Sequence, residues 1–454
     1  MVMQSINPAT EEVLKEYQKD KDGVVDDKLA RADLAYRHHR LTTFGERAEL
    51  TLRVAELLER NKEDYARIIT AEMGKTFKSA VAEVEKCAFN ARFYAGNAES
   101  MLARVPVSTL YSESFIEYRP VGPVLAVMPW NFPFWQVFRF ATPALMAGNV
   151  ALLKHASNVP QCALLIEQIF KEAGFAEGCF QTLMIGSDKV ERVIADNRVR
   201  AVTLTGSEGA GAKVAEAAGR NIKKTVLELG GSDAFLVMPS ADLDDAVAKG
   251  VTGRIQNAGQ SCIAAKRFIV HADIYDRFRD KLLEKFKALK TGDPMDEATD
   301  LGPLAMKQGV TDLDKQVQDS VKKGAIKAFG AQPVGGKGYF FQPGILETIP
   351  RDAPAYSEEF FGPVALLFKA PSLGDAIKLA NATRFGLGSA VFTQERDEME
   401  EAVRDLDAGF TAINTIVASD PRLPFGGVKS SGYGRELAAE GIREFCNIKT
   451  VVRA

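Results

Sequence analysis

Apolar and polar residues in the N-terminal part of the chain recur at the spacing of an α-helix. Between Asp26 and about Leu102, apolar side chains return every three or four positions with Glu, Lys and Arg between them, most clearly from Leu50 to Leu58. Such periodicity is typical of helices that bury one face. The pattern predicts two or three long helices in this region.

The pattern changes to that of strands after these helices. Residues 112–118 alternate apolar and polar side chains, which favours an edge or bridging strand, whereas residues 121–128 are apolar almost throughout, which favours a buried one. Further apolar runs predict strands over 150–153, 180–183 and 201–205 and a helix over 163–173. Alternating strands and helices predict a parallel, doubly wound α/β sheet.

A second α/β series begins beyond Leu229. Its predicted strands cover 234–237, 268–270, 364–368 and 391–393. No tract rich in Pro, Gly or Ser separates the two series, so we expect packed rather than tethered domains. The last apolar stretch, 445–452, predicts a strand with little left to pair with in its own domain, which favours a contact between subunits.

Composition narrows the classes of function. The 454 residues are too many for one hydrophobic core, and a net charge of −3 with mixed signs along the chain gives no basic surface for nucleic acid or an anionic membrane. No apolar run is long enough to span a bilayer, and residues 1–10 carry no export signal. We therefore expect a cytoplasmic protein that acts on small molecules, without a membrane or nucleic-acid partner.

The cysteines point to a reactive thiol rather than to a metal or disulfide site. The five cysteines are scattered and never spaced C-x-x-C, and the four histidines lack ligand spacing. Most cysteines are buried and inert, but Cys262 follows a polar, glycine-containing stretch, residues 259–261. A thiolate presented by such a loop could attack a carbonyl carbon.

Two polar residues near predicted strand ends are further candidates. Glu228 follows the apolar residues 225–227 and precedes two glycines; such a carboxylate is either simply solvated or a general base whose pKa is raised by apolar surroundings. Asn131 lies just before Pro133. If Pro133 begins a helix, Asn131 or Phe132 would be its N-cap, and a catalytic role for Asn131 is the alternative.

Four motifs occur in one order along the chain, and together they resemble the aldehyde dehydrogenase superfamily. They are Pro129-Trp130-Asn131-Phe132-Pro133, Glu228-Leu229-Gly230-Gly231, Gly259-Gln260-Ser261-Cys262 and Glu359-Phe360-Phe361-Gly362-Pro363. The resemblance extends from about Ile6 to the C-terminus. It implies that Cys262 is the nucleophile, forming a thiohemiacetal and then a thioester, and that Glu228 is the base that activates water. The Asn131 amide and the Cys262 backbone N–H would form the oxyanion hole.

The same resemblance assigns roles to the domains. Residues 1–103 and 121–229 would form a Rossmann-like cofactor-binding domain, and residues 230–430 an α/β catalytic domain. Residues 104–120 and 431–454 would be bridging segments of a small β oligomerisation arm. A homodimer or homotetramer is expected.

Several residues are implied in binding a nicotinamide cofactor. A glycine-containing turn opens a helix after the strand ending at residue 205, although it does not match G-x-G-x-x-G. By resemblance, the helix N-terminus near Gly206 and Ser207 faces the pyrophosphate. Glu359 and Phe361 would contact the nicotinamide ribose and ring. Trp130 and Leu229 are assigned to the same cleft.

The adenosine end predicts a preference for NADP, with NAD as the alternative cofactor. Many family members have Glu where this chain has Ser157, and that carboxylate accepts ribose hydroxyls while repelling a 2′-phosphate. Ser157 removes the repulsion, and Lys154 adds a cation nearby.

Within the family, the chain most resembles the bacterial succinate semialdehyde dehydrogenases. The residues that carry this resemblance are Glu117-Tyr118-Arg119-Pro120, Trp135-Gln136-Val137, Ala418-Ser419-Asp420 and Phe425-Gly426-Gly427-Val428-Lys429. In that group the residues matching Arg139 and Ser419 hold the substrate carboxylate, and Trp135 and Ser261 are assigned to the same pocket. A spacing of four residues would put Asn131, Trp135 and Arg139 on one helical face. The alternative for Arg139 is an ion pair.

Two departures from relatives bear on this prediction. Some relatives have a second arginine where this chain has Gln256, so carboxylate binding would be weaker or less exclusive. Others have a cysteine at the position of Ala264, so a disulfide switch next to the nucleophile is not expected.

Alternative functions remain open from the sequence. An aldehyde dehydrogenase for another semialdehyde or a broad aliphatic set would carry the same motifs. A cysteine hydrolase would also use Cys262, but it normally needs a histidine, and none lies near these motifs. A catalytically inactive homologue is disfavoured because Cys262, Glu228 and Asn131 are all present.

Overall fold

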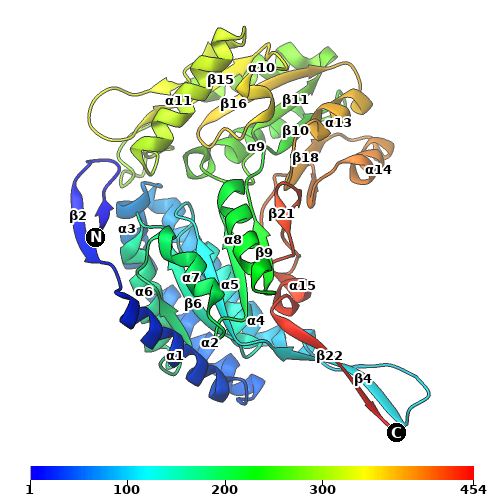
Figure 1. Ribbon diagram of the computed structural model, residues 1–454. Helices are drawn as coiled ribbons and strands as arrows, with labels where there is room; N and C mark the ends of the chain where they lie inside the picture. The colour runs from blue at the N-terminus through cyan, green and yellow to red at the C-terminus, as the bar shows by residue number, and fades with distance from the viewer. Residues whose placement is uncertain (1) are drawn as a thin grey trace.

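The computed structural model describes residues 2–454 as two α/β units, with an arm of paired strands projecting from the N-terminal unit (Figure 1). The N-terminal unit is built on a six-stranded sheet and the other on a seven-stranded sheet. No helix within residues 2–454 is long and apolar enough to cross a membrane.

Four helices occupy the helical N-terminal region: α1 (Asp22–His39), α2 (Phe44–Arg60), α3 (Lys62–Met73) and α4 (Phe77–Met101). The predicted number of two or three is wrong because short breaks divide the periodic pattern. Thr43 begins α2 with a capping box that it shares with Glu46. Gly74 ends α3 in the left-handed conformation, with φ of 83°. A hairpin of β1 (Val2–Ile6) and β2 (Val13–Gln18) precedes these helices.

The first sheet contains the strands that the apolar runs predict. Its order is β21 (Gly432–Tyr433), β9 (Lys224–Glu228), β8 (Ala201–Thr205), β5 (Pro123–Met128), β6 (Val150–His155) and β7 (Phe180–Thr182). All strands are parallel except β21 at the edge. The connecting helices are α5 (Trp135–Met146), α6 (Pro160–Glu172), α7 (Val190–Ala195) and α8 (Glu208–Arg220). The predicted doubly wound α/β sheet is confirmed.

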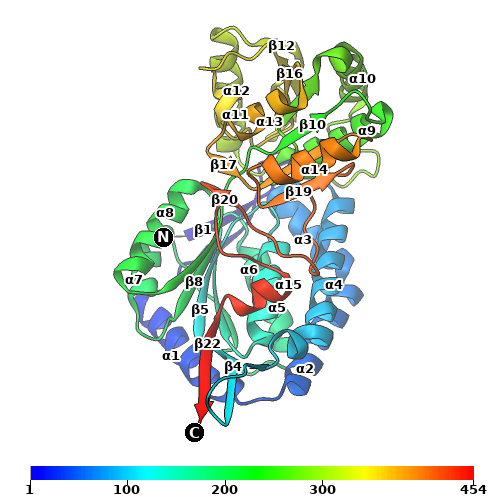
Figure 2. The ribbon, with the colours of Figure 1, turned by 90° about the vertical axis from the view of Figure 1, so that its right-hand side faces the viewer.

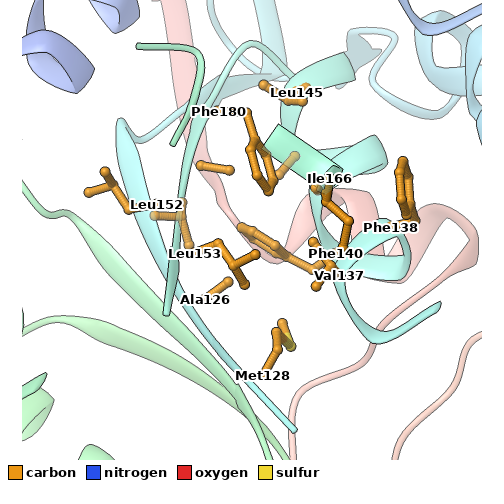
Figure 3. Packing of buried hydrophobic residues seen from close by; sticks show 14 of the residues in the cluster. Ala126, Met128, Val137, Phe138, Phe140, Leu145, Leu152, Leu153, Ile166 and Phe180 are labelled. Atoms are coloured by element: carbon orange, nitrogen blue, oxygen red, sulfur yellow. The ribbon is translucent and has the colours of Figure 1, made fainter. Parts of the chain in front are cut away.

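The core of this unit lies where α5 and α6 pack on the sheet. Figure 3 shows Phe140 of α5 and Ile166 of α6 near Ala126 of β5 and Leu153 of β6, and all four side chains are buried. Every residue of α5 is buried. A polar side chain on this helix must therefore find its partners inside the protein.

The second sheet has the order β12 (Ile326–Phe329), β15 (Gly344–Glu347), β16 (Val364–Ala370), β11 (Arg267–His271), β10 (Ala234–Val237), β18 (Gly388–Phe392) and β19 (Phe410–Ile413). Only β12 is antiparallel. Its main helices are α9 (Leu243–Ile255), α10 (Tyr275–Ala288), α11 (Lys307–Lys322), α13 (Leu373–Asn381) and α14 (Arg396–Asp405). The sequence predicts β10, β11, β16 and β18. It misses β12, β15 and β19, which are short and carry no distinct period.

The arm joins segments that lie far apart in the sequence. It consists of β3 (Val105–Pro106), β4 (Glu113–Pro120) and β22 (Cys446–Arg453), and β22 pairs with β4 along its whole length. The predicted C-terminal strand therefore has a partner in its own chain. The predicted bridging segment 431–454 is too long, because β21 joins the first sheet and α15 (Ala438–Arg443) packs against α4 and α5.

The two units face each other across the carboxyl ends of the first sheet (Figure 2). The turns after β5, β8 and β9 lie at this edge, which is where ligands bind in open parallel sheets. The chain passes into the second unit directly after Glu228, the last residue of β9. Candidate residues from both units are thereby brought together.

Candidate active site

The loop that presents Cys262 has an unusual backbone. Asn257 and Ala258 adopt left-handed conformations, with φ of 57° and 52°, and Gly259 follows with φ of 76°. A non-glycine residue in this region costs about 1 to 3 kcal/mol and persists only where the surroundings fix it. A Cβ on Gly259 would lie 2.3 Å from the carbonyl carbon of Gly362, so glycine is required there.

Buried side chains hold this loop in place. Arg254, which is fully buried, donates to the carbonyls of Gly259 and Gly362 at 2.7 and 2.6 Å. Lys266, also fully buried, donates to the carbonyls of Ser261 and Cys262 at 2.8 and 2.7 Å. These bonds add side-chain donors to carbonyls of the bent loop, of which that of Ser261 also accepts from the Ala264 backbone N–H at 3.2 Å. The loop is therefore rigid where it carries the thiol.

Cys262 lies between two cavities. One, of about 180 Å³, is lined by residues of α4, α5 and the loop, including Trp135 and Ser261. The other, of about 300 Å³, is lined by the turns after β5, β8 and β9 and by Glu359 and Phe361 of the second unit. Cys262 belongs to the lining of both. A molecule in either cavity would contact Cys262.

The surroundings of the thiol favour its protonated form. Burial raises the pKa of Cys262 well above its ordinary value, and the neighbouring Glu228 carboxylate adds to this, while Lys266 and Arg139 oppose it. Formation of the nucleophilic thiolate therefore needs a base. Glu228 is placed to supply one, because its buried Oε1 has no hydrogen-bond partner within residues 2–454.

The hydrogen bonds around Asn131 suit an oxyanion hole. The side-chain Nδ2 of Asn131 donates to the Gln260 backbone carbonyl at 3.1 Å, and the backbone carbonyl of Asn131 accepts from Asn257 Nδ2 at 2.7 Å. One amide hydrogen is thus held by the protein while the second is left for a ligand. The Cys262 backbone N–H makes no hydrogen bond within residues 2–454. The resemblance to aldehyde dehydrogenases implies these same two donors for the oxyanion.

The predicted capping role of Asn131 or Phe132 is wrong. Helix α5 begins at Trp135 rather than at Pro133, and the residue before it makes no side-chain cap. The cap comes from another helix: Glu83 of α4 accepts from the backbone N–H groups of Phe134 and Trp135 at 2.8 and 2.9 Å. An acceptor so far away in sequence has no local signature. It leaves Asn131 free of the helix terminus.

The larger of these two cavities contains most of the predicted cofactor residues. Its lining includes Trp130, Gly206, Ser207, Leu229, Glu359 and Phe361. Ser207 caps α8, and a Cβ added to Gly206 would meet only the Leu204 side chain, at 3.6 Å. An exposed helix N-terminus with a glycine beside it fits a pyrophosphate. The ring centroids of Trp130 and Phe361 lie 5.8 Å apart in an edge-to-face arrangement, and both side chains line this cavity.

A groove of about 720 Å³ continues from Ser207 along α8 and fits the adenosine end. Lys154, Lys213 and Arg220 are among its lining residues, together with Glu191 and Glu216. Burial lowers the pKa of Lys154. Ser157 is exposed and does not itself line the groove. The structure thus places Lys154 in the groove and Ser157 outside its lining.

The smaller cavity contains the predicted substrate residues. Trp135, Arg139, Ser261 and Ser419 all line it, with Gln256 and Lys86. Trp135 and Arg139 share one face of α5, as their spacing predicts. Asn131 does not belong to that face, because it precedes the helix and lines the other cavity.

Arg139 forms ion pairs, the alternative that the sequence leaves open. Its guanidinium donates to Glu228 Oε2 at 3.1 Å, and its Nε lies 2.5 Å from Glu436 Oε2. All three side chains are buried, so the two carboxylates compensate the cation where water cannot. Burial raises the pKa of Glu436 to about 7. Arg139 is an ion-pair residue that holds Glu228.

Several other polar residues of the site are not predicted from the sequence. Lys266 and Arg254 lie at the ends of apolar elements, where a cation in the sequence is usually exposed to solvent. Their burial, which shows that they hold a loop, is visible only in the structure. Lys86, Glu83 and Glu436 lie outside the four motifs and reach the site only through the fold. Lys266 also forms an ion pair with the predicted ribose ligand Glu359, at 3.2 Å.

Comparison with known proteins agrees with this geometry. The profile of the Aldehyde dehydrogenase family matches residues 1–451. The chain is 54% identical over 457 residues to succinate-semialdehyde dehydrogenase (NADP(+)) of Mycobacterium avium, covering 99% of this chain and 96% of that protein. It is 53% identical over 454 residues to succinate-semialdehyde dehydrogenase (NADP(+)) 1 of Mycobacterium tuberculosis, covering 99% of each.

The solved structures that resemble this chain include proteins of the same kind. The crystal structure of succinic semialdehyde dehydrogenase from Streptococcus pyogenes in complex with NADP+ has a TM-score of 0.97 and 40% identity, covering 99% of each chain. A succinate-semialdehyde dehydrogenase from Burkholderia pseudomallei has a TM-score of 0.96 and 32% identity, covering 99% of this chain and 94% of that one. The chain belongs to the aldehyde dehydrogenase family.

Proposed function

We propose that the protein oxidises succinate semialdehyde to succinate with NADP+, through a thioester on Cys262. The observation that carries the proposal is the position of Cys262 in the lining of two cavities, one with polar groups for an acid end and one with the features of a dinucleotide site. The names of the relatives support the choice of substrate and cofactor.

The first half of the reaction forms the thioester. Glu228 Oε1 accepts the Cys262 proton, and the sulfur adds to the aldehyde carbon to give a thiohemiacetal oxyanion. The Asn131 amide and the Cys262 N–H stabilise that oxygen. The bound nicotinamide supplies the hydride acceptor, so that loss of hydride from the carbon leaves a thioester.

The second half hydrolyses the thioester. Glu228 first releases the Cys262 proton to solvent and then takes a proton from water, and the hydroxide adds to the acyl carbon. The C–S bond breaks, the leaving thiolate takes the proton back from Glu228, and succinate is released. Arg139 limits the movement of Glu228, since it pairs with both Glu228 and Glu436. Both proton transfers thus use one carboxylate with a fixed neighbour.

The proposed cofactor site uses the turns at the end of the first sheet. Gly206, Ser207 and the α8 N-terminus would hold the pyrophosphate, and Lys154 would lie near the adenosine ribose and its 2′-phosphate. Glu359, Phe361 and Trp130 would hold the nicotinamide ribose and ring, with Leu229 beside them. Ser157 contributes by the absence of a carboxylate rather than by a contact.

We also propose that the arm pairs with a second copy of the chain, giving a homodimer or homotetramer. Val105, Ile448 and Val452 expose apolar side chains on β3 and β22, and β22 has a free edge because, among residues 2–454, it pairs only with β4. Light scattering should give the mass of a dimer or tetramer. A lower mass for Ile448→Asp would place the interface at the arm.

Steady-state kinetics test the function. With purified protein, kcat/KM should be higher for succinate semialdehyde than for butanal, and higher with NADP+ than with NAD+. Preference for butanal or another uncharged aldehyde would support the alternative of a broad aliphatic enzyme. Ester hydrolysis without cofactor as the main activity would contradict the proposal.

A further inference from the structure

The substrate cavity contains two cations in different electrostatic states. Arg139 is paired with both Glu228 and Glu436. Lys86 of α4 has no carboxylate within 4.0 Å of its Nζ among residues 2–454 and so forms no ion pair there. The charge available to an anionic ligand is therefore that of Lys86.

The Lys86 ammonium is directed at the cavity by its neighbours. Its Nζ donates to Ser419 Oγ at 2.7 Å and lies 4.3 Å from the centre of the Trp135 ring. Lys86, Ser419 and Trp135 all line the cavity that contains Cys262. A cation over an indole face is held by the ring quadrupole, which fixes its position without neutralising it. Two of the three ammonium hydrogens remain for a ligand.

We infer that Lys86, with Ser419, binds the carboxylate of the substrate and is the residue that selects an acid-ended aldehyde. This inference rests on the proposed oxidation of succinate semialdehyde. It replaces Arg139 as the anchor, because an anion at Arg139 would have to compete with two buried carboxylates that are already in place.

The cost of burying Lys86 supports this assignment. Burial lowers its pKa to about 8, with the nearby Arg139 cation adding to the effect. A carboxylate beside the ammonium would offset that cost, so the charged substrate gains more from the site than an uncharged one. The hydroxyl of Ser419 can donate to the same carboxylate, since the Lys86 bond uses only its acceptor side.

Lys86→Met tests the inference, because methionine keeps an unbranched stem against Trp135 and removes the charge. Loss of one charge-assisted hydrogen bond should lower kcat/KM for succinate semialdehyde by about 10- to 150-fold. The loss should appear mainly as a higher KM, since the contact is remote from the reacting carbon. With butanal, which has the same carbon chain and no carboxylate, the loss should be far smaller.

Two further variants make the result decisive. Lys86→Arg should restore most of the activity toward succinate semialdehyde. Arg139→Gln should reduce turnover of both aldehydes by similar factors, because it disturbs Glu228 rather than the distal end. Melting temperatures close to that of the wild type would show that each variant is folded.

The outcomes separate this inference from the proposed function. If Lys86→Met loses activity equally toward both aldehydes, or if Arg139→Gln is the selective variant, Lys86 is not the anchor. If the wild-type enzyme itself does not prefer succinate semialdehyde to butanal, the proposed function fails instead.

Discussion

The two cavities that meet at Cys262 are built in different ways. The cofactor-side cavity is formed largely by turns at strand ends, where Gly206, Gly230 and a helix N-terminus expose backbone groups. The substrate-side cavity is formed by long side chains from α4, α5 and the nucleophile loop, including Lys86, Trp135 and Arg139. We therefore expect one side to recognise its ligand by backbone shape and the other by side-chain charge.

This difference explains which changes should alter specificity. Backbone groups at strand ends suit a ligand shared by a whole family, because they change little when side chains change. A charged side chain is replaced by a single substitution. We therefore expect cofactor choice and aldehyde choice to be separable, with only the residues around Cys262 affecting both.

The largest effect should come from Cys262→Ala, since this sulfur serves both cavities. Turnover should fall by at least about 10⁴-fold, the scale seen when a nucleophile is removed, while cofactor binding and melting temperature change little. Cys179→Ala is the matched control, because Cys179 is buried in the first unit outside both cavities. It should retain turnover. Near-normal activity of Cys262→Ala would show that Cys262 is not the nucleophile on which both cavities depend.

Asn131→Ala should have the next largest effect. The amide lies on the cofactor side but acts on the oxygen of the aldehyde, so kcat should fall about 100- to 1000-fold for charged and uncharged aldehydes alike. Presteady-state hydride transfer is the measurement. A loss confined to succinate semialdehyde would mean that Asn131 belongs to substrate selection instead.

The pH dependence of thiol alkylation should reveal the environment that the two cavities share. Because burial and Glu228 raise the pKa of Cys262, the thiolate fraction keeps growing as pH rises and falls as pH drops. The rate of Cys262 alkylation by iodoacetamide should therefore increase about tenfold per pH unit without a plateau near neutral pH. Peptide mapping by mass spectrometry follows it. A plateau at neutral pH would show that the thiolate is already formed.

The smallest expected effect is that of Ser157→Glu. A carboxylate near Lys154 should repel the 2′-phosphate and shift the ratio of kcat/KM values from NADP+ toward NAD+ by about tenfold or more, the effect of about 1.4 kcal/mol. Preference between succinate semialdehyde and butanal should not change. Ser157→Gln, which adds size without charge, should keep the NADP+ preference. If both variants behave alike, the charge argument is wrong.

The sequence predicts the cofactor side better than the substrate side, and the reason is physical. Strand ends and the turns after them are continuous in sequence, so Gly206, Leu229 and Glu359 fall within recognisable motifs, and the parallel sheet follows from apolar runs. The position of Cys262 between two cavities depends on how two units pack. Periodicity carries no information about that packing.

The electrostatic state of Arg139 illustrates the limit most clearly. Its spacing from Trp135 predicts the correct helical face, and both residues line one cavity. Its partners Glu228 and Glu436 come from distant segments, so the sequence could not show that the charge is already compensated. The same applies to Lys86, whose contact with Ser419 joins α4 to the segment between the second sheet and β21.

The most direct test of the account is to trap the intermediate on Cys262. In Glu228→Gln, assayed at a raised pH at which Cys262 loses its proton without help from Glu228, hydride transfer should still give a burst of NADPH with succinate semialdehyde, but hydrolysis should stall because no carboxylate activates water. Mass spectrometry of the quenched, digested protein should find a succinyl group on the Cys262 peptide, and wild-type protein should show much less of it. Continued turnover without any acyl adduct would contradict the covalent mechanism and the role of Glu228 together.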